Sequence, residues 1–193
     1  MKSFIITYPG NDRIDETLLH LKSEGHLPQV IEVVQGFLPY VNVLKTVQNI
    51  ISDHVNDENI LIFEDDVRLY KNFDPDELAR KAKGRFTTIC TGSFSTEHVY
   101  KSDIEGLLYC ITYHGAQAVI YNKKIYPLIL RANDIYIDAQ SKYWPDTMLT
   151  YPFLTYQKDY DDINKDGDLV RREHLFKLTE HKIKRLIELK AIY

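Results

Sequence analysis

Cysteine is scarce in this chain, and its scarcity excludes two classes of small protein. Two cysteines occur among 193 residues, Cys90 and Cys110, and both lie in apolar stretches far apart in the sequence. The paired spacing of a zinc site and the cysteine density of a disulfide framework are both missing. We therefore expect two reduced thiols in the core.

Long apolar runs are missing as well. The first residues, Met1 to Tyr8, hold a short apolar stretch before Pro9, which is too short for a signal peptide or a membrane span. We expect a cytoplasmic protein, with at most peripheral contact to the inner face of a membrane. The hydrophobic content of 44% over 193 residues suits one sizeable core, so we predict a single domain over residues 1–193.

A glycine-rich phosphate loop is also lacking. The turn after the first apolar segment, Pro9 to Asp12, is neither glycine-rich nor basic. A nucleotidyltransferase would normally hold its triphosphate with such a loop at this place. We therefore rank nucleotidyl transfer third among the candidate functions.

Net charge is low, at −4, but it is unevenly distributed. From Leu169 onward seven basic residues outnumber three glutamates, so this tail carries +4 and the remainder of the chain −8. An acidic body with a basic tail is not typical of a general nucleic-acid binder. The tail alone could contact DNA or an anionic membrane.

Apolar segments of strand length and of helix length alternate along the chain. Strands are predicted at residues 3–8, 29–34, 60–63, 87–90 and 118–121. Helices are predicted at 12–24, 42–54, 123–131 and 169–191, and another begins at the Asp74-Pro75 cap. The short turns between them indicate an α/β fold with a mostly parallel sheet, flanked by helices and followed by a long amphipathic C-terminal helix.

Three adjacent carboxylates follow the predicted strand at residues 60–63. Glu64, Asp65 and Asp66 would lie at its carboxyl end, where open α/β sheets hold their ligands. Three carboxylates in one place repel one another unless a cation joins them, so a divalent metal that holds phosphate is indicated. A solvated strand end or a helix-capping cluster is the alternative.

Four stretches, in the same order along the chain, resemble one enzyme family. The first is Ile60 to Val67, an apolar strand followed by Glu-Asp-Asp. The others are the Gly-Ala segment within residues 114–124, the pair Ile137-Asp138, and the Pro-x-Leu-x-x-Gln pattern within residues 151–157. Together they resemble glycosyltransferase family 25, a GT-A (Rossmann-like) group associated with lipooligosaccharide and collagen sugar transfer. Size and composition also suit a small bacteriophage member.

The resemblance implies a glycosyltransferase that uses a nucleoside-diphosphate sugar, such as a UDP-sugar, with Mn²⁺ or Mg²⁺. Asp66 would bind the metal directly and Glu64 would be the second candidate ligand. Glu64 and Asp65 would also hold the metal's water molecules or the donor ribose. Residues 1–92 would bind nucleotide sugar and metal, residues 93–168 the acceptor, and residues 169–193 would form a basic helix.

An inverting transfer needs a carboxylate that accepts the proton of the acceptor hydroxyl. Asp138 matches the family's position, and Asp146 is a rival because Trp144 nearby could stack on a sugar ring. Either aspartate could instead cap a helix. The implied acceptor is a surface glycan or lipooligosaccharide, or a hydroxymethylated DNA base in a phage enzyme, and no obligate protein partner is indicated.

Five residues near the first two strands are candidates for donor binding: Thr7, Tyr8, Arg13, Gln35 and Gly36. Thr7, Tyr8 and Arg13 follow the first strand, where this fold places the nucleotide base, and Arg13 could pair with a donor phosphate. Gly36 would let the loop after the second strand approach the base or ribose closely. An exposed helix arginine is an equally good interpretation of Arg13.

A second acidic segment fits the template of an EF-hand calcium loop. Its candidate Ca²⁺ ligands are Asp162, Asn164, Asp166, Asp168 and Glu173. An acidic turn that caps the last helix through Asp168 is the alternative. This segment supports the main competing function, a calcium-binding interaction protein whose C-terminal helix docks a partner.

The predicted C-terminal helix has apolar residues that recur at helical spacing. We expect them to share one face that packs into the core rather than onto a membrane. They are Leu175, Leu178, Ile183, Leu186 and Ile187.

Overall fold

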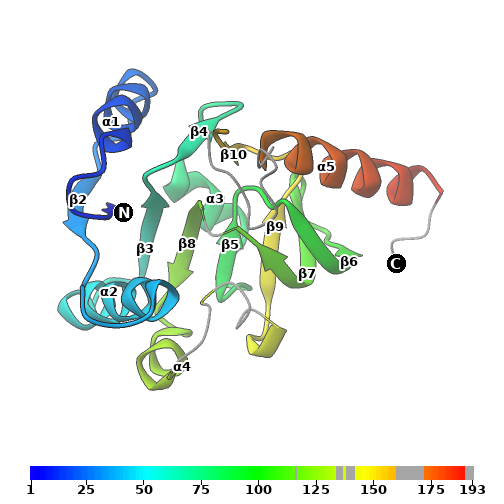
Figure 1. Cartoon of the computed structure of the whole chain (residues 1–193). Helices are drawn as coiled ribbons and strands as arrows, with labels where there is room; N and C mark the ends of the chain where they lie inside the picture. The colour runs from blue at the N-terminus through cyan, green and yellow to red at the C-terminus, as the bar shows by residue number, and fades with distance from the viewer. Residues whose placement is uncertain (116, 134–136, 138–141, 160–171, 190–193) are drawn as a thin grey trace.

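An eight-stranded sheet forms the centre of the molecule (Figure 1). The computed structural model describes residues 1–115, 117–133, 137, 142–159 and 172–189. The strands of this sheet are β1 (Lys2–Thr7), β2 (Gln29–Glu32), β3 (Asn59–Glu64), β5 (Thr88–Cys90), β6 (Ser95–Lys101), β7 (Leu107–His114), β8 (Ala118–Asn122) and β9 (Thr147–Thr150). Their spatial order is β2-β1-β3-β8-β5-β9-β7-β6.

Most strands of the large sheet run in the same direction. Six of its strands run the same way, whereas β7 and β8 run against them. A second, two-stranded sheet pairs β4 (Val67–Leu69) with β10 (Thr155–Gln157) in antiparallel register. This small sheet holds the chain that follows β3 against the chain that precedes α5.

Five helices flank the sheets in the described part of the chain: α1 (Arg13–Ser23), α2 (Pro39–Asp53), α3 (Pro75–Lys81), α4 (Tyr126–Arg131) and α5 (Arg172–Glu188). α3 begins as the sequence predicts, because the Asp74 carboxylate accepts hydrogen bonds from the backbone N–H groups of Asp76 and Glu77. Pro39 starts α2 three residues before the predicted boundary, because proline suits the first position of a helix.

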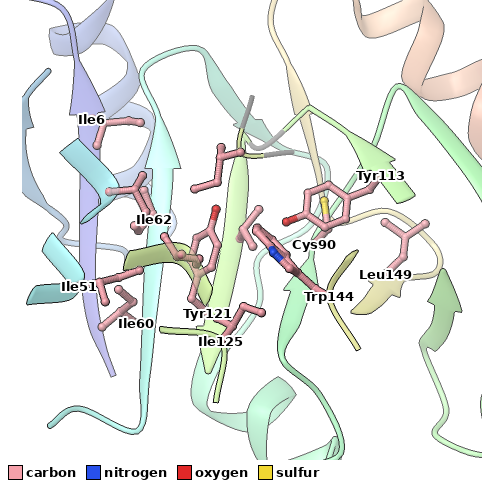
Figure 2. Packing of buried hydrophobic residues seen from close by; sticks show 14 of the residues in the cluster. Ile6, Ile51, Ile60, Ile62, Cys90, Tyr113, Tyr121, Ile125, Trp144 and Leu149 are labelled. Carbon is pink, nitrogen blue, oxygen red and sulfur yellow. The ribbon is translucent and has the colours of Figure 1, made fainter. Parts of the chain in front are cut away.

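Side chains alternate between the two faces of the sheet along the central strands, so the core has two layers. Ile60 and Ile62 of β3 join one cluster, together with residues of α2, α4 and α5. Leu61 and Phe63 join the other, which α1 and α3 cover. Successive strand side chains point to opposite faces, so a strand that is apolar throughout must be covered on both. Figure 2 shows part of the first cluster.

The structure confirms the predicted α/β fold class, a mostly parallel sheet flanked by helices with a long C-terminal amphipathic helix. It adds strands that the apolar pattern did not predict, namely β4, β6, β7 and β9. Both cysteines are free and buried, as expected. No described helix is both long enough and apolar enough to cross a bilayer.

The predicted core face of the last helix is confirmed only in part, because Ile183 is buried as expected while three of the other four residues are exposed. Phe176 and Ile183 are the buried apolar residues of α5, whereas Leu175, Leu178 and Ile187 are exposed. The core contacts recur at positions 176, 179 and 183, so the buried row lies to one side of the predicted row. A row of leucines is therefore left facing outward.

Candidate active site

The three acidic residues form the turn between β3 and β4. Glu64 is the last residue of β3, and Asp65 and Asp66 lead directly into β4. β1 and β3 are parallel neighbours, so their carboxyl ends meet at this turn. β8 is antiparallel to β3 and begins at the same edge, where the carbonyl of Gln117 accepts a hydrogen bond from the Glu64 backbone N–H at 2.9 Å. The sheet thus gathers three chain segments around the acids.

Asp65 anchors this turn to β1 and α1. Its Oδ2 accepts hydrogen bonds from Thr7 Oγ1 at 2.7 Å and from Asn11 Nδ2 at 2.6 Å. Its backbone carbonyl accepts a third from Thr17 Oγ1 at 2.5 Å. The side-chain hydroxyl of the donor-binding candidate Thr7 therefore binds Asp65, and this contact holds the turn in position.

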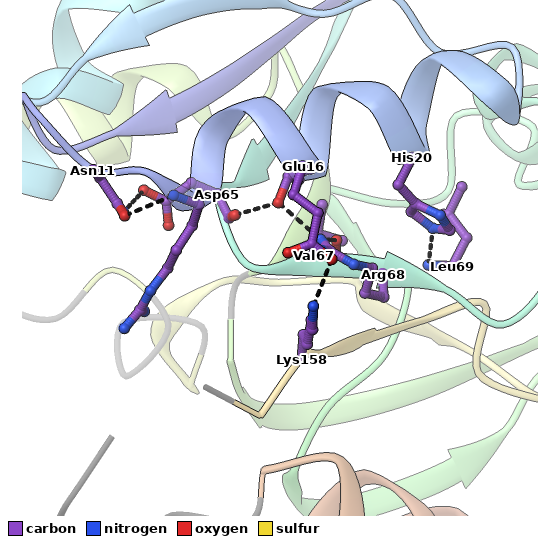
Figure 3. A network of polar contacts seen from close by, with 10 residues as sticks. Asn11, Glu16, His20, Asp65, Val67, Arg68, Leu69 and Lys158 are labelled. Atoms are coloured by element: carbon purple, nitrogen blue, oxygen red, sulfur yellow. Dashed lines mark hydrogen bonds and ion pairs between the residues drawn. The ribbon is translucent and has the colours of Figure 1, made fainter. Parts of the chain in front are cut away.

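A buried arginine extends the same polar network toward β10. The Arg68 guanidinium pairs with Glu16 at 2.9 Å and donates to Thr17 Oγ1 at 2.7 Å. Glu16 also pairs with Lys158, which follows β10 (Figure 3). Hydrogen bonds from Lys158 and Arg68 lower the pKa of Glu16. The network ties α1, β4 and the chain after β10 into one frame around the acidic turn.

Asp66 is the most deeply buried of the three acids, with 6% of its surface exposed. Its Oδ2 accepts from Arg172 Nη1 at 3.1 Å, while its Oδ1 is buried without a hydrogen-bond partner. Burial raises the pKa of Asp66 to about 6, although the Arg172 charge acts in the opposite direction. A buried carboxylate oxygen that receives no hydrogen bond from the protein is electrostatically suited to a cation.

Glu64 faces a cleft rather than the core. Its Oε2 accepts a hydrogen bond from Gln157 Nε2 of β10 at 3.0 Å. The cleft has a volume of about 520 Å³ and also admits the Arg172 side chain. Its lining residues are Tyr8, Pro39, Tyr40, Val43, Glu64, Phe94, Gly115, Ile137, Gln157 and Arg172.

The lining of this cleft divides chemically. One group is aromatic or apolar and includes Tyr8, Tyr40 and Val43. The other is polar and ionic, with Glu64, Gln157 and Arg172. A ligand with a flat ring joined to a charged group matches such a lining better than a uniformly apolar or uniformly charged ligand does.

Gly115 is a position in the cleft where only glycine fits. Its φ of +92° is rarely adopted by other residues, and a Cβ there would lie 2.8 Å from Phe94 Cδ1. The missing side chain lets the Phe94 ring pack directly against the Gly115 backbone at the cleft. This glycine belongs to the Gly-Ala segment that carried part of the family resemblance.

The remaining donor-binding candidates lie at different distances from the cleft. Tyr8 lines it, and its hydroxyl donates to the carbonyl of Pro39 at 2.9 Å. Arg13 begins α1, and its charge opposes the rise that burial causes in the pKa of Asp66. Gln35 and Gly36 lie in the loop between β2 and α2 and do not line the cleft; Gly36 has a φ of +107°, so a backbone turn accounts for this glycine.

Asp146 lies away from the cleft. It immediately precedes β9, which is parallel to β5, and its carbonyl accepts from the Thr87 backbone N–H just before β5. It therefore occupies the edge where strands begin, opposite the edge that holds Glu64. Trp144 is buried in the core against Tyr121, so the proposed stacking of its ring on a sugar is wrong. Asp138 lies outside the described residues; its neighbour Ile137 lines the cleft.

Most of the calcium-loop candidates lie outside the described residues, namely Asp162, Asn164, Asp166 and Asp168. Glu173 is described and pairs with Lys177 one turn further along α5 at 2.5 Å. The preceding described segment is strand β10 rather than the helix that enters an EF-hand. This arrangement does not favour the calcium-binding alternative.

The residues present can accommodate a divalent metal. In the parts of the chain that the structure describes, no three His, Cys, Asp or Glu side chains converge as a complete metal centre. Mg²⁺ sites that also use substrate phosphates often need one or two carboxylates from the protein. The unpaired Asp66 Oδ1 and the Glu64 carboxylate at the cleft can supply these.

Arg172 was not predicted as a site residue. The sequence places it in the basic tail, and nothing in the neighbouring residues indicates that it contacts Asp66. Gln157 had a signal, since it closes the Pro-x-Leu-x-x-Gln pattern, but its contact with Glu64 depends on β10 pairing with β4.

Comparison with known proteins supports the fold and leaves the family open. No protein-family model and no curated protein matches the chain, so membership of glycosyltransferase family 25 is not supported. Among solved structures, A197 from STIV superposes with a TM-score of 0.55 at 14% identity, covering 88% of this chain and 93% of that one. This likeness shows a shared fold.

Two further solved structures are similar at a lower level. A glycosyltransferase involved in the glycosylation of the major capsid of PBCV-1 has a TM-score of 0.49 at 10% identity, covering 94% of this chain and 100% of its own. An apo UDP-glucose pyrophosphorylase has a TM-score of 0.47 at 11% identity, covering 92% and 71%. At these values neither structure adds to the assignment of the site.

Proposed function

We propose that this chain is a glycosyltransferase that moves a sugar from a nucleoside-diphosphate sugar to an acceptor hydroxyl, assisted by Mn²⁺ or Mg²⁺. The observation that carries the proposal is the cleft at the carboxyl ends of β1 and β3. There Glu64 and Arg172 line the same cavity, and Arg172 contacts the buried Asp66. Open α/β sheets bind their ligands at this edge.

The divided lining suggests the orientation of the donor. Tyr8 and Tyr40 offer ring faces and edges for a nucleoside base. Arg172 offers N–H donors to the diphosphate, and a guanidinium suits phosphate oxygens because it can donate two parallel hydrogen bonds. A volume of about 520 Å³ lies within the range of small-molecule sites.

Asp66 and Glu64 would hold the metal. Asp66 would contribute the carboxylate oxygen that has no hydrogen-bond donor, and Glu64 would contribute from the cleft. When bound, the metal would supply positive charge to the diphosphate as it leaves the sugar. Asp65 has a different task in this scheme, because its contacts to Thr7 and Asn11 fix the turn that carries both ligands.

The chemical step exchanges one bond at the anomeric carbon for another. The bond from this carbon to the diphosphate oxygen breaks, and a bond to the acceptor oxygen forms. The diphosphate leaves with the electron pair, and Arg172 stabilises its charge. The proton of the acceptor hydroxyl passes to a base if the transfer inverts the anomeric centre. Asp138 remains the candidate base, since Asp146 lies at the opposite sheet edge.

The proposal names an acceptor hydroxyl and leaves its carrier open. A surface glycan and a hydroxymethylated DNA base each offer such a hydroxyl.

Product analysis on a panel of nucleotide sugars tests the proposal. The purified protein is incubated with UDP-, GDP-, CDP-, ADP- and dTDP-sugars in Mn²⁺, Mg²⁺ or EDTA, and free nucleoside diphosphate is measured. We expect slow, metal-stimulated hydrolysis of one donor class. Pyrophosphate release from a nucleoside triphosphate and a sugar 1-phosphate would instead identify a nucleotidyltransferase. Calcium binding without any nucleotide effect would also contradict the proposal.

A further inference from the structure

α5 presents an apolar row to solvent along one side. We call it the leucine stripe: the exposed Leu175, Leu178 and Leu189, with the half-buried Leu186 between them. Leu175 is 40% exposed, Leu178 50% and Leu189, just past the helix end, 70%. Spacings of three, eight and three residues keep these side chains on one side, because about 3.6 residues complete a helical turn.

The neighbouring side of α5 is already fixed. Phe176 and Ile183 are buried in the core, and Thr179 Oγ1 donates to the carbonyl of Phe94 at 2.6 Å. Glu180 accepts from the Phe153 backbone N–H at 2.6 Å. In Figure 1, α5 lies at the edge of the molecule beside β10. The stripe therefore does not help to hold α5 in place.

Basic and acidic residues of α5 lie on different sides of the leucine stripe. Lys182 and Arg185 lie within it or along its border, and neither forms an ion pair with a described residue. The three glutamates of α5 project to the other flank, where Glu173 is paired with Lys177 and Glu180 is hydrogen-bonded to Phe153. An apolar stripe bordered by cations and free of carboxylates is complementary to an anionic lipid surface.

We propose that the leucine stripe, with Lys182 and Arg185, docks α5 onto an anionic membrane surface. The leucines enter the boundary between headgroups and acyl chains, and the two cations contact lipid phosphates. Nucleic acid fits this surface less well, because exposed leucines offer nothing to a phosphate backbone. The proposal goes beyond sugar transfer and does not depend on it.

Vesicle flotation tests the docking surface. The full chain is mixed with vesicles of phosphatidylcholine alone or of phosphatidylcholine with about a third phosphatidylglycerol. We expect flotation with the anionic vesicles only, weakened by high salt because surface charges are screened. Two variants should each reduce partition about ten-fold: Leu175→Ser/Leu178→Ser/Leu189→Ser and Lys182→Gln/Arg185→Gln.

Matched controls separate docking from general stickiness. Leu19→Ser removes a leucine that is 71% exposed on α1, and Lys184→Gln removes a cation from the acidic flank of α5. Both should float like the unmodified protein. Failure of the unmodified protein to bind anionic vesicles would overturn the proposal, as would equal losses in the controls. A dimer that the triple leucine variant dissociates would show that the stripe binds a second copy.

Discussion

Arg172 Nη1 lies 3.1 Å from Asp66 Oδ2, although 106 positions separate the two residues in the sequence. The contact joins the first turn of α5 to the acidic turn after β3, and it places a cation against the most buried carboxylate of the site. Arg172 also lines the cleft, so a single guanidinium connects Asp66 with the space available to a ligand.

Replacing Arg172 should separate diphosphate binding from nucleoside binding. We expect Arg172→Gln to weaken a nucleoside diphosphate about ten-fold or more and the matching nucleoside hardly at all, because the lost contact is to phosphate. Calorimetry with both ligands measures the two effects. Lys177→Gln is the control, since Lys177 is on the same helix but pairs with Glu173 instead of lining the cleft. Equal losses for both ligands would contradict the assigned contact.

Asp66 and Asp65 should respond differently to the same substitution. Asp66→Asn should reduce donor hydrolysis at least about a hundred-fold with little loss of thermal stability, because a buried charge is costly to the fold. Asp65→Asn should lower the unfolding free energy by about 1 to 3 kcal/mol, because Oδ2 accepts two hydrogen bonds that the amide can satisfy only in part. Similar melting curves for the two variants would count against these separate roles.

Gly92 should be a sensitive position for stability. A Cβ there would lie 2.1 Å from the carbonyl oxygen of Thr155, so Gly92→Ala must displace β10. We expect a loss of about 3 kcal/mol or more in urea unfolding, and lost donor binding because Gln157 moves with β10. Gly10→Ala is the comparison, since its Cβ meets nothing within 4 Å and only its φ of +73° opposes it. Equal losses of unfolding free energy in the two variants would show that β10 can move at little cost and would contradict this prediction.

Acid should destabilise the fold partly through His26. Burial lowers the pKa of His26, so the folded protein releases this proton more readily than the unfolded chain does. Below about pH 6.5 the unfolded state binds more protons, and stability contributed by neutral His26 is lost as pH falls through its folded pKa. In urea unfolding at several pH values, the unfolding free energy of His26→Gln should fall less steeply with decreasing pH than that of the unmodified protein. An equally steep fall in both proteins would contradict the role of His26.

The sequence was sufficient to predict the sheet's central strands but not its far half. β3 is apolar at four consecutive positions and ends in charge, so its existence and its approximate end were predictable. β6 and β7 are long strands whose residues are mixed in burial and polarity, and their pairing depends on contacts between segments that no local pattern specifies.

The candidate site divides in the same way. The acidic turn was predictable because it follows a buried strand directly. The separate tasks of its three acids were not, since Thr7, Gln157 and Arg172 reach them from distant segments. The position of Asp146 was not predictable either, because its place at the other edge depends on the direction of β9 in the sheet.

Titration of nucleoside-diphosphate sugars into the protein in Mn²⁺ tests the central claim most directly. We predict that one donor class binds with a Kd between about 1 μM and 1 mM, that EDTA weakens it, and that Asp66→Asn and Arg172→Gln each weaken it further than Lys177→Gln does. Absence of binding for every nucleotide sugar and nucleoside diphosphate, with and without metal, would contradict the assignment of this cleft as a donor site.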